Sequence, residues 1–70
     1  MEFVVCINNQ DYAASLEVRK IYQVLPDPGA NKHQMIRIID ESGEDYLYPR
    51  DYFLPIELSE TVQKVLATVL

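Results

Sequence analysis

The chain has 70 residues, of which 49% are hydrophobic, and six Lys and Arg against eleven Asp and Glu give a formal net charge of −5. This acidic balance has the wrong sign for a domain that draws its affinity from nucleic-acid phosphates, so nucleic-acid binding is disfavoured. The length suits one small domain over residues 1–70, and the lone Cys6 excludes an internal disulfide.

Cysteine usage and apolar runs indicate where the protein resides. A single cysteine is typical of a reducing compartment. The start of the chain lacks the charged, apolar and small-residue segments of a secretory signal. No apolar run approaches the roughly twenty residues that a membrane helix needs. We therefore expect a cytoplasmic protein that does not enter membranes.

The first half of the chain reads as two strands with long connections. Residues 2–7 form a nearly continuous apolar run that is too short for a helix, which predicts a strand. Residues 8–15 are polar and without a period, and predict a loop. Residues 16–18 predict a brief extended segment, and residues 21–25 a second strand that a proline ends. Two prolines and a glycine in residues 26–32 predict a surface connection.

Residues 35–49 hold two apolar runs around a polar turn with one glycine, a pattern that predicts a β-hairpin. If residues 41–43 form the loop and Gly43 is left-handed, Ile38 pairs with Tyr46 and Ile36 pairs with Tyr48. We expect these four residues to share the core face. The other face is mixed and carries Met35, Arg37, Ile39, Asp45 and Leu47.

The end of the chain predicts a tight turn over residues 49–53, a last strand over residues 54–58 that Pro55 confines to an edge, and a helix over residues 59–70. Ser59 is a suitable N-cap for this helix. Its apolar stripe consists of Val62, Val65, Leu66, Val69 and Leu70. Three turns are unstable alone, so we expect the helix to dock on its own sheet. Pairing with the same helix of a second chain is the alternative.

These elements predict a mainly β fold: a small, strongly bent sheet or barrel of four to five strands over residues 2–58, followed by the C-terminal α-helix. Several segments, taken in order, also resemble small uncharacterised bacterial and phage proteins with an SH3-like β-barrel. They are residues 5–9, residues 16–25, residues 37–46, and Tyr48 and Pro49 before Phe53. The resemblance covers most of residues 4–53 and implies an SH3-like barrel. That pattern has a glycine before the lysine of its second segment, where this chain has Arg19.

Few residues are suited to catalysis. Cys6 and His33 are the only candidates for a nucleophile and its base, and a thiol in an apolar strand usually packs as an inert small hydrophobe. A zinc site would need carboxylates to complete its four ligands. The acidic residues of the hairpin end lack the alternating ligands of a calcium loop and fit a solvated turn: Asp40, Glu41, Glu44 and Asp45. We predict no enzymatic activity, no metal and no cofactor.

Five tyrosines stand out in a chain without tryptophan. We assign Tyr22 and Tyr48, with Phe53, to the core. We expect Tyr12, Tyr46 and Tyr52 to be exposed, with Asp11 and Asp45 beside them. A tyrosine-lined shelf beside an acidic loop is what proline-rich or basic peptides meet on SH3 domains. Packing at the rim of the core is the plainer interpretation of the same residues.

The leading hypothesis is therefore a small non-enzymatic binding module with a protein or peptide partner. One alternative is a structural or oligomeric role through the terminal helix. Another is an acidic inhibitor that imitates nucleic acid to occupy a basic partner. A monomer is favoured over a homodimer because the stripe lacks a longer heptad pattern.

Overall fold

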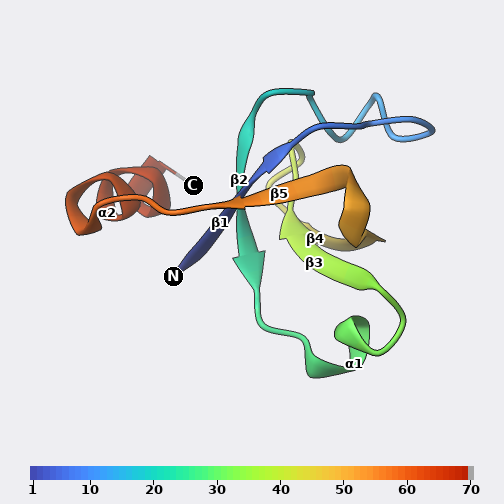
Figure 1. Cartoon of the computed structure of the whole chain (residues 1–70). Helices are drawn as coiled ribbons and strands as arrows, with labels where there is room; N and C mark the ends of the chain where they lie inside the picture. The colour runs from blue at the N-terminus through green and yellow to red at the C-terminus, as the bar shows by residue number, and fades with distance from the viewer. Residues whose placement is uncertain (70) are drawn as a thin grey trace.

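A computed structural model describes residues 1–69, with side chains as far as Leu66. Five antiparallel strands form one sheet in the order β4-β3-β2-β1-β5 (Figure 1). The strands are β1 (Glu2–Cys6), β2 (Ile21–Leu25), β3 (Met35–Ile39), β4 (Asp45–Pro49) and β5 (Phe53–Ile56); the helices are α1 (Pro28–Asn31), the 3-10 turn η1 (Arg50–Tyr52) and α2 (Glu60–Val69). The predicted mainly β class and C-terminal helix are confirmed. Within the described residues β4 and β5 do not pair, so the sheet is not closed into the predicted barrel.

The core lies inside the bend of the sheet, on the face that alternate strand residues share. It is formed by Val4, Cys6, Leu16, Tyr22, Val24, Ile36, Ile38, Tyr48 and Phe53. Leu16 is 1% exposed although it belongs to the loop between β1 and β2. No strand forms over residues 16–18, where a brief extended segment is predicted; Val18 belongs to a turn, and the Leu16 side chain closes the core from the loop.

The β3–β4 hairpin has the predicted register, with Ile38 opposite Tyr46 and Ile36 opposite Tyr48. Gly43 has a φ of 83°, as the three-residue loop requires. Three of the four paired residues are buried as expected. Tyr46 is 58% exposed, because it lies near the loop end of a strand that has a neighbour on one side only.

The connection between β2 and β3, predicted as a surface connection, contains the one-turn helix α1. Asp27 precedes α1, and its Oδ1 accepts a hydrogen bond from the N–H of Ala30 at 3.1 Å. Pro28 stands in the first turn, where its missing N–H is not needed. Ala30 is buried, so this connection packs against the sheet at one point.

The last strand begins one residue earlier than predicted and is an edge strand, as Pro55 indicated. Ser59 caps α2, since its Oγ accepts the N–H of Val62 at 3.2 Å. Leu66 borders a groove of about 400 Å³ between α2 and the outer face of the sheet. Val62 and Val65 are 42% and 57% exposed. Their predicted docking on the sheet is wrong because the apolar stripe is turned partly away from it; Val69 and Leu70 lie outside the described side chains.

Candidate binding surface

Two of the three tyrosines predicted to be exposed pack on the ring of Tyr48, and the third contacts one of these two. Tyr48 is 1% exposed, and the rings of Tyr12 and Tyr46 lie edge-on to it at centroid distances of 4.9 and 5.3 Å. Tyr12 also contacts Tyr52 at 6.1 Å. Tyr12, Tyr46 and Tyr52, which we call the tyrosine shelf, therefore form one surface. Tyr46 is exposed, and the other two are half-buried.

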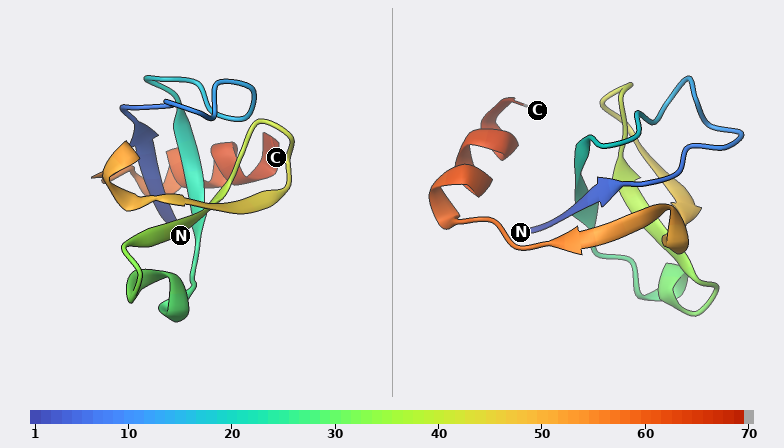
Figure 2. Two further views of the ribbon diagram at one scale, coloured as in Figure 1. Left: turned by 90° about the vertical axis from the view of Figure 1, so that its right-hand side faces the viewer. Right: turned by 45° about the horizontal axis from the view of Figure 1, so that its top comes forward.

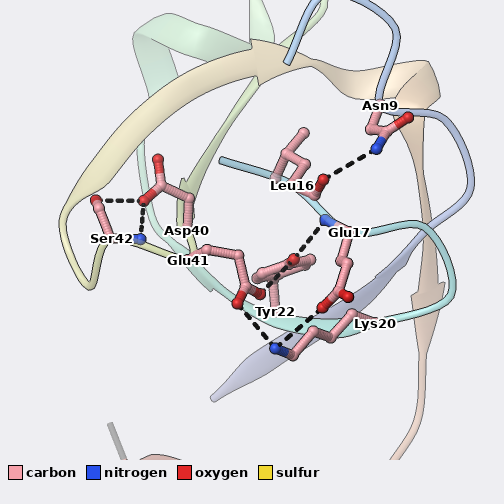
Figure 3. Close-up of polar contacts among 8 residues, drawn as sticks. All are labelled: Asn9, Leu16, Glu17, Lys20, Tyr22, Asp40, Glu41 and Ser42. Atoms are coloured by element: carbon pink, nitrogen blue, oxygen red, sulfur yellow. Dashed lines mark hydrogen bonds and ion pairs between the residues drawn. The ribbon is translucent and has the colours of Figure 1, made fainter. Parts of the chain in front are cut away.

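The loop between β1 and β2 positions Tyr12 through a series of tight turns. The N–H of Tyr12 donates to the carbonyl of Asn9 at 2.8 Å, and the N–H groups of Ser15 and Leu16 donate back to the carbonyl of Tyr12. The amide of Asn9 donates to the carbonyl of Leu16 at 3.0 Å (Figure 3). Because Leu16 is anchored in the core, the whole turn is held against the sheet.

A first side-chain network ties this loop to the hairpin (Figure 3). The hydroxyl of Tyr22 donates to Oε2 of Glu41 at 2.6 Å and accepts the N–H of Glu17 at 2.8 Å. Nζ of Lys20 lies 2.8 Å from Oε1 of Glu41 and 3.4 Å from Oε2 of Glu17. Lys20, followed by Tyr22, lowers the pKa of Glu41 below its ordinary value. Burial, followed by the bond to Glu41, raises the pKa of Tyr22.

A second network joins the same loop to β4. The hydroxyl of Tyr48 donates to Oδ2 of Asp40 at 2.7 Å and lies 2.8 Å from Oγ of Ser15. Burial, followed by Asp40, raises the pKa of Tyr48 to about 12. Burial of Asp40 opposes ionisation, but hydrogen bonds from Ser42 and Tyr48 outweigh it and lower the pKa of Asp40. Asp40 and Glu41 therefore hold the hairpin to the β1–β2 loop, although residues 41–45 are exposed to solvent as predicted.

The two acidic residues predicted beside the shelf are separated by the fold. Asp11 is exposed. Burial raises the pKa of Tyr52 most, and the charge of Asp11 is the next largest cause. Asp45 belongs to the other face of β4, where its Oδ2 lies 2.8 Å from a guanidinium nitrogen of Arg37. Asp51 of η1 also acts on the pKa of Tyr52 and is exposed, so it borders the shelf instead. Its position directly before Tyr52 in the sequence is the signal that places a carboxylate there.

The candidate catalytic residues are not arranged as a catalytic pair. Cys6 is fully buried in the core, its thiol donates to the carbonyl of Asn8 at 3.3 Å, and burial raises its pKa. His33 is exposed in the segment between α1 and β3. Across residues 1–69, no group of three or more His, Cys, Asp or Glu could hold a metal ion. The thiol therefore packs as the predicted small hydrophobe.

No protein-family model, curated protein or solved structure matches the chain. In the described part of the chain, no helix has the length and apolar character needed to cross a bilayer. The interpretation of the tyrosine shelf therefore depends on its own geometry.

Proposed function

We propose that the protein is a small binding module that receives a protein or peptide on the tyrosine shelf. The observation that carries this proposal is the position of Tyr46, which is 58% exposed while its ring contacts the fully buried Tyr48. An aromatic side chain held against a rigid core loses little conformational entropy on binding. Such side chains are frequent anchors of protein interfaces.

The charges around the shelf indicate the chemistry of the partner. Asp11 and Asp51 flank Tyr52, and the whole chain has a net charge of −5. The positive charge of Arg37 does not neutralise these carboxylates, because Arg37 forms ion pairs with Asp27 at 2.9 Å and with Asp45 at 2.8 Å. A cationic side chain gains from both the carboxylates and the tyrosine faces. We infer a basic, extended or proline-rich segment as the partner.

We also propose that the sheet is an opened relative of the SH3-like barrel. Three features support this: the strand order β4-β3-β2-β1-β5, the long loop between β1 and β2, and the 3-10 turn directly before β5. In that arrangement the shelf lies where the long loop and the 3-10 turn meet, because Tyr12 comes from the loop and Tyr52 from η1. Fold likeness alone does not establish a function, so a binding experiment must decide.

The test is an NMR titration of the labelled protein with a proline-rich peptide that carries two arginines. We expect shift changes around Tyr12, Tyr46 and Tyr52. Tyr46→Ala should weaken binding about tenfold or more, as loss of an interface anchor does. Leu54→Ala removes a similarly exposed apolar side chain from β5 and should leave the affinity unchanged. An equal loss of affinity in both variants, or no shift changes with this peptide, would contradict the proposal.

A second candidate function is assembly through α2, and the exposed Val62 and Val65 favour it. These valines lie three positions apart on one face of the helix, as a helix contact requires. Mass measured by light scattering across concentration should then show an oligomer that Val65→Asp dissociates. Lys64→Asp is the matched control, because Lys64 is exposed on the side of α2 opposite the apolar stripe. A monomer at every concentration argues against this function.

A further inference from the structure

The two edges of the sheet differ in the backbone groups that they offer. One edge is β5. Just before it, the N–H of Ile7 donates to the carbonyl of Tyr52 at 2.8 Å, so every second residue after Tyr52, namely Leu54 and Ile56, bonds to β1. The backbone groups of the two residues between them, Phe53 and Pro55, point away from β1. The N–H of Phe53 is taken up by the η1 turn, and Pro55 has none. This edge therefore presents no free donor within β5.

The edge formed by β4 is open. The N–H of Asp40 donates to the carbonyl of Glu44 at 3.0 Å, so the even-numbered residues of β4 bond to β3. Asp45 and Leu47 therefore direct their N–H and C=O groups away from the sheet. Among residues 1–69, neither N–H has a hydrogen-bond acceptor. An edge with unpaired groups is a template for pairing with another strand.

The terminal helix does not cover this edge. Figures 1 and 2 show α2 on the opposite side of the molecule from β4. A groove of about 390 Å³ straddles the edge and is lined by Tyr12, Met35, Arg37, Tyr46 and Leu47. Charged side chains often protect such edges. Here the charge of Asp45 is balanced by Arg37 at 2.8 Å, so the usual repulsion between two copies is weakened.

We propose that β4 pairs antiparallel with β4 of a second copy, about a two-fold axis that passes beside Tyr46. In this register Asp45 of each copy faces Leu47 of the other, and each such pair exchanges two N–H···O=C bonds. Every outward donor and acceptor of Asp45 and Leu47 is then used. The two Tyr46 side chains meet at the position where opposite side chains are closest, and each Asp45 faces a leucine instead of another carboxylate.

This self-complementarity selects a second copy as the occupant of the edge. The same surface patch serves both partners, as a two-fold contact requires. A contact between two five-residue strands is smaller than the roughly 1,200–2,000 Å² of stable complexes. We therefore expect a weak dimer that forms at high protein concentration. The inference does not depend on the tyrosine shelf binding a ligand.

The test compares the wild-type protein at low micromolar and at millimolar concentration. Over this range we expect the mass in sedimentation equilibrium to double. The amide exchange of Asp45 and Leu47 should slow about tenfold or more, since pairing protects a backbone amide. Leu47→Pro removes one outward donor, as Pro55 does naturally on β5, and should stay monomeric. Leu47→Ala keeps the N–H and should still form the dimer.

Three results would overturn the proposal. One is a monomeric mass throughout the millimolar range. Another is a dimer in which the amides of Asp45 and Leu47 exchange as fast as in the monomer. The third is loss of the dimer in Val65→Asp, which alters α2 and leaves β4 intact. If Leu47→Pro fails to fold, the concentration dependence of wild-type exchange still decides the question.

Discussion

Replacing Tyr22 by phenylalanine removes one oxygen atom from the network that holds the β1–β2 loop to the hairpin. That oxygen donates to Glu41 at 2.6 Å and accepts the N–H of Glu17 at 2.8 Å, and Tyr22 is 5% exposed. The ring remains, so the core should keep its packing. Any loss of stability therefore reports on the two hydrogen bonds.

The expected size follows from the type of each bond. A neutral bond contributes about 1 kcal/mol and a bond to a charged group about 1.5–3 kcal/mol, while partial exposure of Glu41 lowers the second figure. We expect Tyr22→Phe to reduce the free energy of unfolding by about 2–3 kcal/mol. A domain of this length has roughly 4–10 kcal/mol in total. The substitution should therefore be easily measured.

Urea unfolding followed by circular dichroism gives the free energy directly, and it should be done at low protein concentration. Tyr46→Phe is the matched control, because the hydroxyl of exposed Tyr46 makes no hydrogen bond in the described structure. It should change stability by less than about 0.5 kcal/mol. Combined with Glu41→Gln, Tyr22→Phe should show a non-additive effect, since the two groups contact each other. A Tyr22→Phe protein as stable as Tyr46→Phe would refute this reasoning.

Four further substitutions and conditions test other parts of the structure. Gly43→Val should destabilise the hairpin by about 1 kcal/mol or more in urea unfolding: a Cβ would have room there, but φ is 83°. Arg19→Gly should stabilise the protein by up to about 1 kcal/mol in the same assay, because Arg19 has a φ of 73°, and a destabilised variant would contradict this. Cys6→Ala should cost about 1–2 kcal/mol by leaving a small void, and native Cys6 should react with thiol reagents only on unfolding. Lys20 holds the native pKa of Glu41 below its ordinary 4.5, so ionised Glu41 stabilises the folded protein. This stabilisation is complete above pH 4.5 and is lost as the pH falls through the lower native pKa. When the free energy of unfolding is measured against pH, Glu41→Gln should remove this part of the acid-induced loss.

The hairpin could be predicted residue by residue because one glycine fixed its loop. Once Gly43 is placed in the left-handed region, the period of two determines every pair and both faces. Arg19 illustrates a signal that was visible but incomplete. The pattern of the resemblance has a glycine at this position, and Arg19 has a φ of 73°, in the left-handed region that glycine adopts most easily.

One remaining error concerns information that a local pattern does not contain. The spacing of Val62, Val65 and Leu66 defines a stripe on α2, but the angle at which the helix meets the sheet decides which part is covered. Asp45 was an avoidable error, since the predicted register already placed it with Arg37 on the mixed face of the hairpin, away from Tyr46. The helix α1 was another, since Asp27 before Pro28 is a recognisable cap and first-turn proline.

The place of β1 in the sheet has a consequence for the synthesis of the chain. β1 lies between β2 and β5, and Phe3 pairs with Ile56, so a strand that is synthesised early needs a neighbour that is synthesised after β2, β3 and β4. Until β5 has emerged, one side of β1 presents unpaired backbone beside apolar side chains. The sheet can therefore be completed only after β5 has emerged, and a chain cut before residue 53 leaves β1 as an open edge.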